Sequence, residues 1–199
     1  IPHLCHSNKL GYEADGNCRS CVVEIKGERA LAASCIRKPS NGMEVITNND
    51  KVEKSQKLVL ELLLSDQPEK EKSHNQKSHF WEILQTNQIS KTRFPKKDSK
   101  IVPSLDNSHP AMTVALDACI QCGLCIRACR DVQVNDVLGM SGRGTNSYPV
   151  FDFDDLMGSS SCVGCGECVQ ACPTGALMET ALLDDNNVQT VFPDKHIKS

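Results

Sequence analysis

A repeated cysteine spacing constrains this chain more than any other feature. The segments CIQCGLCIRACR (119–130) and CVGCGECVQACP (162–173) align without a gap, and each has the order C-x2-C-x2-C-x3-C. Three thiolates on one tight loop can bind three corners of a cubane iron–sulfur cluster, and in two-cluster proteins the fourth cysteine binds the other cluster. The spacing therefore predicts two [4Fe-4S] clusters whose ligands cross between the two segments.

The crossing fixes the expected ligand sets. We expect the first cluster to be bound by Cys119, Cys122, Cys125 and Cys172, and the second by Cys129, Cys162, Cys165 and Cys168. The alternative is a pair of zinc sites, which would need only two C-x2-C pairs each. Disulfides would be the default in a small secreted protein, but four thiols within so short a loop suit a cluster better than a bridge.

Residues around the repeat fit the same interpretation. Glycines at 123, 164 and 166 would let the loop backbone approach the cluster sulfides and donate N–H groups to them. We expect each fourth cysteine to open a helix, with Pro173 in the first turn, where its missing N–H costs nothing. Arg127 and Arg130 either offset cluster charge or are surface residues.

Four more cysteines near the start of the chain form a less regular group, spaced C-x12-C-x2-C-x13-C: Cys5, Cys18, Cys21 and Cys35. This spacing departs from the C-x4-C-x2-C order of plant-type ferredoxins, and four cysteines can also hold zinc. The predicted hairpin beside Cys21 and the neighbouring cubane pair favour a β-grasp domain with one [2Fe-2S] cluster.

Composition limits the other possibilities. Aromatic residues make up 4% of the 199 residues, and the 39% hydrophobic fraction already counts all twelve cysteines. The apolar core is therefore expected to be thin, with metal clusters supplying crosslinks. A net charge of −3 argues against a general nucleic-acid binder. The best apolar run, residues 58–64, is too short to cross a membrane and contains Glu61, so we expect no membrane insertion and a cytoplasmic location.

The periodicity of the chain predicts an α+β fold. Residues 22–25 and 30–33 form a hairpin across Lys26-Gly27, and residues 43–47 form a further strand. A helix is expected from Asp50, as its cap, to Ser65, with Pro68 beyond its end. A second, short helix covers residues 80–84, and strands at 134–140 and 148–153 pair across a loop.

These elements divide the chain into four predicted parts. Residues 1–48 form an N-terminally truncated [2Fe-2S] β-grasp domain, and residues 49–110 a helical and irregular connector. Residues 111–183 form a two-cluster [4Fe-4S] ferredoxin-like domain. Residues 184–199 form a tail or a linker.

Several segments resemble a known family. The tract CHSNKLGYEADGNCRSCVVEIKGERALAASCIRKPSNGMEV resembles the [2Fe-2S] domain shared by the complex I large iron–sulfur subunit, the hydrogenase diaphorase subunits and the α subunit of NAD-dependent formate dehydrogenase. The tracts LELLLSDQPEKEKSH, LDACIQCGLCIRACRDVQVNDVLGM and CGECVQACPTGAL look most like the formate dehydrogenase α subunit. The resemblance covers nearly all of the chain and is most specific from 109 to 178.

One departure separates the chain from two of these relatives. Complex I and the diaphorases usually carry a further cluster after the [2Fe-2S] domain, bound by one His and three Cys. His74 and His79 lie in the corresponding region, but no cysteine accompanies them. That cluster is expected to be absent, and the two histidines are expected to be solvated residues of a polar connector.

The resemblance implies an electron-transfer arm that lacks its own catalytic site. In the full-length relatives, a further [4Fe-4S] cluster and a molybdenum or tungsten bis-pterin guanine dinucleotide domain follow, and flavin- and NAD-binding diaphorase subunits accept the electrons. We therefore expect the chain to be a fragment of a formate dehydrogenase, with the catalytic pterin domain in the same polypeptide. The alternatives are a stand-alone ferredoxin-like carrier, a hydrogenase diaphorase subunit and a zinc-bound structural module.

Overall fold

The computed structural model describes residues 1–96 and 103–190, and its α+β architecture confirms the predicted fold class. Residues 97–102 of the predicted connector and 191–199 of the predicted tail lie outside the described residues. The longer elements, in chain order, are β1 (Val22–Ile25), β2 (Ala32–Ala33), β3 (Val45–Ile46), α1 (Asp50–Ser65), α2 (His79–Thr86), β4 (Met112–Val114), α3 (Leu124–Arg127), η4 (Ala128–Val132, a π-helical turn), β5 (Leu138–Ser141), β6 (Tyr148–Phe151), α4 (Glu167–Ala171) and β7 (Leu177–Glu179). Short 3-10 turns are η1 (Lys70–Lys72), η3 (Leu116–Ala118), η5 (Gly144–Asn146), η6 (Met157–Ser159) and η7 (Thr180–Leu182).

The first three strands form a small antiparallel sheet in the order β2-β1-β3. Val22 of β1 lies opposite Ala33 of β2, and Ile25 lies opposite Val45 of β3. Gly27 adopts a φ of 88°, a left-handed conformation that suits glycine, at the turn after β1. The predicted hairpin and third strand are therefore both present, although β2 and β3 are shorter than expected.

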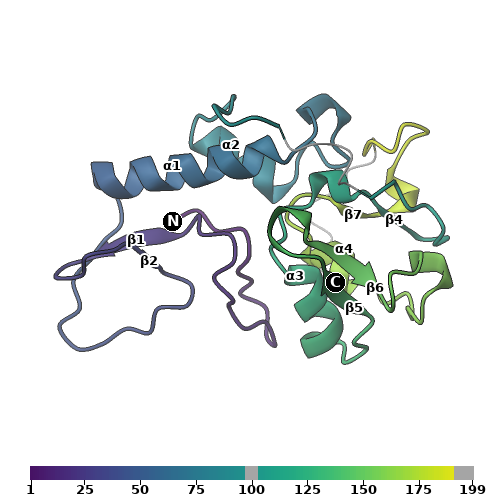
Figure 1. Ribbon diagram of the computed structural model, residues 1–199, viewed down its shortest axis with the longest axis horizontal. Helices are drawn as coiled ribbons and strands as arrows, with labels where there is room; N and C mark the ends of the chain where they lie inside the picture. Colours follow the sequence, from purple (N-terminus) through teal and green to yellow (C-terminus); the bar gives the residue numbers. More distant parts are fainter. Residues whose placement is uncertain (97–102, 191–199) are drawn as a thin grey trace.

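Helix α1 covers the residues predicted for it and lies alongside this sheet (Figure 1). The side chain of Asn49 accepts a hydrogen bond from the backbone N–H of Val52 at 2.9 Å, so Asn49 is the N-cap and Asp50 is the first helical residue. The expectation that Asp50 caps the helix was wrong by one position. The amide of the buried Gln56 donates to the Val22 carbonyl at 2.9 Å, which fastens the helix to β1.

The connector packs on the second half of the chain. Helix α2 buries Phe80, Trp81, Ile83 and Leu84, and the backbone N–H of Phe80 donates to the Pro173 carbonyl at 2.9 Å. The buried amide of Gln67 donates to the Ala118 carbonyl at 2.8 Å. His74 is also buried, so the prediction that it is a solvated residue was wrong, whereas His79 is exposed.

Two short antiparallel strand pairs frame the second half of the chain (Figure 1). Strands β5 and β6 pair as predicted, but β5 begins only at Leu138 because Val134 and Asp136 adopt positive φ angles that no regular strand has. Strands β4 and β7 were not predicted. Their pairing, with Thr113 opposite Met178, joins the two ends of this half.

The helices of the cysteine repeat lie earlier than expected. We predicted that Cys172 opens a helix with Pro173 in its first turn, but α4 ends at Ala171 and Cys172 is extended, with a ψ of 116°. A residue before proline is disfavoured in the helical region because the proline ring clashes with its backbone. Pro173 therefore ends a helix here and does not begin one. Cys129, by contrast, lies inside the π-helical turn that continues α3.

Within the described ranges 1–96 and 103–190, none of the helices has the length and apolarity needed to cross a bilayer.

The hydrophobic cluster that joins the two halves predicts a stability difference between two leucines of α1. Leu60 is fully buried in this cluster, whereas Leu62 is 52% exposed. We expect Leu60→Ala to lower the free energy of unfolding by about 2–5 kcal/mol and Leu62→Ala by less than about 0.5 kcal/mol. Anaerobic urea unfolding of both variants measures the difference, and equal losses would show that α1 does not anchor the cluster.

Candidate metal centres

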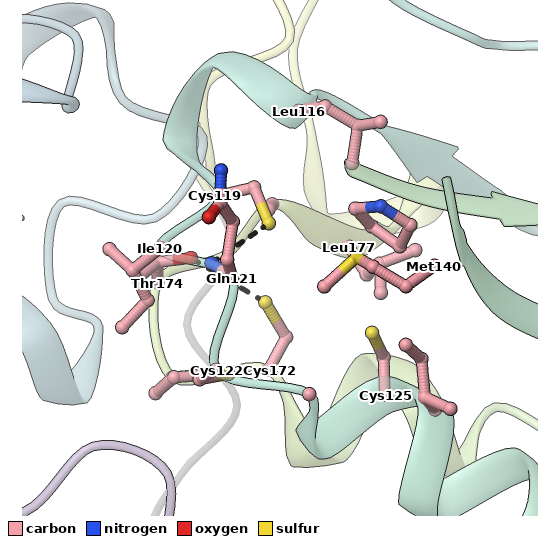
Figure 2. Close-up of a pocket in the computed structure, with 15 residues that line it drawn as sticks. Leu116, Cys119, Ile120, Gln121, Cys122, Cys125, Met140, Cys172, Thr174 and Leu177 are labelled. Carbon is pink, nitrogen blue, oxygen red and sulfur yellow. Dashed lines mark hydrogen bonds between the residues drawn. The ribbon is translucent and has the colours of Figure 1, made fainter. Parts of the chain in front are cut away.

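Four cysteines from both repeats line one pocket in the second half of the chain. They are Cys119, Cys122, Cys125 and Cys172, and Figure 2 shows them around a common space, beside the apolar side chains of Leu116, Met140 and Leu177. Cys119 follows η3 and Cys125 lies in α3. Cys172 belongs to the other repeat and lies directly after α4. This is the set that the sequence predicts for one cluster.

The other four cysteines of the repeat line a second pocket. Cys129 lies there together with Cys162, Cys165 and Cys168, again three from one loop and one from the other. Phe151, Leu138 and Val137 form its apolar wall. Within residues 1–96 and 103–190, no group of three or more His, Cys, Asp or Glu side chains is arranged to hold a single metal ion. The thiols of each pocket instead surround a space.

The two loops have the same backbone conformation at matching positions. Gln121 and Gly164 have φ angles of 55° and 70°, and Gly123 and Gly166 have φ angles of 73° and 76°. The backbone N–H of Gln121 donates to the Cys119 sulfur at 3.4 Å, and that of Gly164 donates to the Cys162 sulfur at the same distance. The predicted role of the glycines extends to Gln121, which takes the same left-handed conformation without being a glycine.

Donors outside the loops also reach the sulfur atoms. The Val137 backbone N–H donates to the Cys129 sulfur at 3.4 Å, and the side-chain amide of Asn135 lies 3.9 Å from the Cys165 sulfur. The Thr174 hydroxyl lies 3.6 Å from the Cys172 sulfur. Hydrogen bonds of this kind stabilise negative charge on sulfur and tune the potential of a bound cluster.

The first four cysteines also gather in one place. Cys5, Cys18 and Cys21 are buried and Cys35 is half-buried; Cys18 and Cys21 precede β1, and Cys35 follows β2. The Cys18 backbone N–H lies 3.4 Å from the Cys5 sulfur, and the Ser20 hydroxyl lies 3.2 Å from the Cys18 sulfur.

The pKa values of cysteines in all three groups are shifted in a way that fits metal centres. A hydrogen bond with Cys5 lowers the pKa of Cys18 to about 5, and the same contact raises the pKa of Cys5. Burial raises the pKa of Cys35 to about 11 and that of Cys168 to about 12, and it also raises the pKa of Cys122 and Cys125. Several buried thiolates therefore exist together only if a cationic centre neutralises them, which is the chemistry that iron–sulfur clusters provide.

Two polar residues near the cysteines are placed differently from what the sequence suggested. Arg127, considered either as a charge partner or as a surface residue, is 1% exposed and contacts both halves of the chain. Arg130 is exposed and pairs with Asp131. The burial of Arg127 has no signal in the sequence, because arginines are mostly exposed and two of its partners, Cys5 and Glu13, lie more than a hundred positions away.

His79 lies between the N-terminal segment that precedes Cys5 and its own helix, where one ring nitrogen is 3.9 Å from the Glu82 carboxylate. The other ring nitrogen of His79 lies 3.0 Å from the His3 carbonyl oxygen, and the two rings have centroids 5.4 Å apart. The ring of His6 contacts His3 in turn, at 5.9 Å. No cysteine lies between Cys35 and Cys119 in the sequence, so neither His74 nor His79 has a thiol partner within the connector.

Two family models match this chain. Residues 1–50 match the 2Fe-2S iron-sulfur cluster binding domain, and residues 107–176 match the 4Fe-4S dicluster domain. The cysteine groups described above fall within these two ranges.

The relatives of the chain are parts of larger enzymes. The NADP-reducing hydrogenase subunit HndD of Solidesulfovibrio fructosivorans is 34% identical over 98% of this chain, and the mitochondrial NADH-ubiquinone oxidoreductase 78 kDa subunit of Candida albicans is 30% identical over 73%. The chain spans 34% and 20% of these relatives, respectively. A crystal structure of an NAD+-reducing [NiFe]-hydrogenase in the H2-reduced state contains a similar chain, with a TM-score of 0.79 and 27% identity over 91% of this chain and 76% of that one.

These matches confirm the predicted combination of [2Fe-2S] and [4Fe-4S] domains, while the specific likeness to formate dehydrogenase stays a prediction. The chain is an iron–sulfur protein related to subunits of NADH-quinone oxidoreductases and of NAD- and NADP-reducing hydrogenases.

Proposed function

We propose that this chain is the electron-transfer arm of an NAD-linked oxidoreductase and holds three iron–sulfur clusters. Cys5, Cys18, Cys21 and Cys35 would bind one [2Fe-2S] cluster, and the two cysteine-lined pockets of the repeat would each bind one [4Fe-4S] cluster. The observation that carries the proposal is the crossing of the repeat: each pocket takes three cysteines from one loop and the fourth from the other. When bound, such clusters supply one-electron transfer.

The residues of the chain perform three tasks for these clusters. The loops fix the thiols through left-handed backbone positions at 121, 123, 164 and 166. Apolar side chains such as Leu116 and Phe151 exclude water from the pockets. Backbone N–H groups of residues such as Gln121 and Val137 donate to cysteine sulfur and stabilise its negative charge.

We further propose that the enzyme is a formate dehydrogenase. The tracts at residues 60–74 and 109–178 resemble its α subunit, and the connector has no cysteine to accompany His74 and His79. On this proposal, a molybdenum or tungsten pterin domain of the same polypeptide oxidises formate, and a flavin- and NAD-binding subunit receives the electrons. A further [4Fe-4S] cluster would precede the pterin site.

A hydrogenase subunit is the second candidate. It is favoured by the match to the NADP-reducing hydrogenase subunit, which extends over 98% of this chain, and by the fold shared with a chain of an NAD+-reducing hydrogenase. The two candidates place the same three clusters in the chain and differ in the substrate that supplies the electrons.

The cluster content predicts the metal composition of the chain. We expect about ten iron atoms and about ten acid-labile sulfides per chain purified anaerobically, because one [2Fe-2S] and two [4Fe-4S] clusters are bound. Iron, sulfide and zinc analyses of the same sample measure this. A preparation that holds zinc in place of iron, or whose thiols are oxidised to disulfides, would contradict the proposal.

The crossed ligand sets predict which cluster each fourth cysteine supports. Cys129→Ala is expected to damage the same [4Fe-4S] cluster as Cys162→Ala, because both thiols line one pocket, and to spare the cluster lost in Cys122→Ala. Iron content and the EPR spectrum of the reduced variants distinguish the two clusters. If the Cys129→Ala spectrum instead matches that of Cys122→Ala, the ligands do not cross.

The substrate is tested on the intact complex. We expect a complex isolated anaerobically with this chain to reduce NAD with formate and not with H2. The isolated chain is expected to oxidise neither substrate, because on this proposal its cysteine-lined pockets hold electron-transfer clusters and the substrate site belongs to another domain. Formate- and H2-dependent NAD reduction are measured in the same preparation. Activity with H2 alone would select the hydrogenase candidate.

A further inference from the structure

Arg127 is a buried cation between the first cysteine group and the first pocket of the repeat. It is the largest of the side chains that the structure buries almost completely, with 1% of its surface exposed. It belongs to α3 and lies two residues beyond Cys125 in the sequence. Charged side chains are seldom fully buried unless they are paired, so the contacts of this arginine indicate its role.

The guanidinium of Arg127 donates to the backbone of one cysteine from each neighbouring group. One terminal nitrogen, Nη2, donates to the Cys5 carbonyl at 2.8 Å and to the Cys122 carbonyl at 3.2 Å. The other terminal nitrogen donates to the Glu13 carbonyl, and Nε donates to the Gly123 carbonyl at 3.4 Å. A single planar fork therefore joins residues 5–13 to residues 122–123.

Two polar neighbours complete this contact. The carboxylate of Asp15 lies 2.9 Å from Nε of Arg127, and the Asp15 side chain is 43% exposed. The side-chain amide of Asn17 donates to the same Cys122 carbonyl at 3.2 Å. The side chain of Arg127 is thus inside the protein, while its counter-ion reaches solvent.

This arrangement has an electrostatic consequence. Reduction of an iron–sulfur cluster adds negative charge, and a nearby positive charge stabilises that added charge more strongly inside a protein than in water. The partial exposure of Asp15 lets solvent screen the carboxylate more than the guanidinium. A net positive field is therefore expected at both groups of cysteines that Arg127 contacts.

We propose that Arg127 is a positioning residue that locks the Cys5 backbone to the Cys122 backbone and, through its charge, raises the reduction potentials of the clusters at these two cysteines. The inference rests on the proposed cluster content. On this inference, Arg127 binds no cluster itself but raises the reduction potentials of both the cluster at Cys5 and the cluster at Cys122.

Two substitutions with opposite expected signs test the proposal. Arg127→Gln removes the cation and is expected to lower both potentials, so that the ratio of reduced to oxidised cluster at a fixed ambient potential falls on the order of tenfold, or about 59 mV for a one-electron couple. Asp15→Asn removes the anion, leaves the carbonyl contacts of Arg127 in place, and is expected to raise both potentials. EPR-monitored redox titration of the full chain measures each cluster separately.

Matched controls separate charge from structure. Arg130→Gln removes an arginine from the same helical segment. Arg130 is exposed and hydrogen-bonds to Asp131, and it interacts with Asp15 and Asp136 only through longer-range charge, so solvent screens it and both potentials are expected to shift much less than in Arg127→Gln. Arg127→Lys keeps the charge and is expected to keep the potentials closer to those of the unmodified chain than Arg127→Gln does.

The outcomes distinguish this inference from the proposed function. If the unmodified chain holds no iron, the proposed cluster content fails. If it holds its full iron, the inference is overturned when Arg127→Gln and Asp15→Asn shift the potentials in the same direction, or when neither shifts them. If Arg127 acted only through structure, Arg127→Gln and Asp15→Asn would shift the reduction potentials in the same direction, because both substitutions break the ion pair between Arg127 and Asp15. If the Arg127→Gln variant does not take up iron, the Asp15→Asn variant alone tests the inference. A rise in both reduction potentials supports it, and a fall or no change overturns it.

Discussion

The burial of sulfur ligands in shared pockets is the constraint on which the rest of this structure depends. The second half of the chain has only short helices and paired strands of three or four residues among its described elements, and cysteines and their sequence neighbours line much of both pockets. Burial raises the pKa of Cys122, Cys125 and Cys168, so in the absence of metal these thiols stay protonated and do not repel one another. Metal binding would convert them to thiolates and join α3, α4 and the loops between them, so binding energy and folding energy are coupled.

The two halves of the chain are held together by contacts to the same ligand loops. Residues 5–17 reach the repeat through Arg127 and Asn17, and also through the Tyr12 hydroxyl, which donates to the Glu167 carboxylate at 2.9 Å. Burial and the nearby Glu167 carboxylate raise the pKa of Tyr12, which keeps the hydroxyl a donor. Because Glu167 directly precedes Cys168, residues 5–17 contact both cysteine loops of the repeat. One short segment therefore contributes to the relative positions of all three cysteine groups, together with the contacts that Gln67 and α2 make with the second half of the chain.

The sequence predicts the parts of this fold that follow local rules. The hairpin at 22–33, helix α1 and the β5–β6 pair follow from periodicity and turn residues, and the pocket membership follows from cysteine spacing. The missed features depend on long-range contacts or on single-residue geometry. Strands β4 and β7 are three residues each and pair across more than sixty residues. The burial of Arg127 and of His74 depends on what packs over them, and Pro173 allows either a helix start or a helix end until its neighbours decide.

The segment between the two cysteine-rich halves is held by apolar packing and close backbone contact. In α2, Phe80 and Leu84 are fully buried, and the indole N–H of Trp81 donates to the Ser73 hydroxyl at 3.2 Å. Gly175 has no room for a side chain, because a Cβ atom there would lie 2.6 Å from that of Asn75. Apolar packing and close backbone contact thus hold this segment against the repeat. One ring nitrogen of His79 lies 3.0 Å from the His3 carbonyl oxygen, so the same segment also contacts the N-terminal residues that precede Cys5.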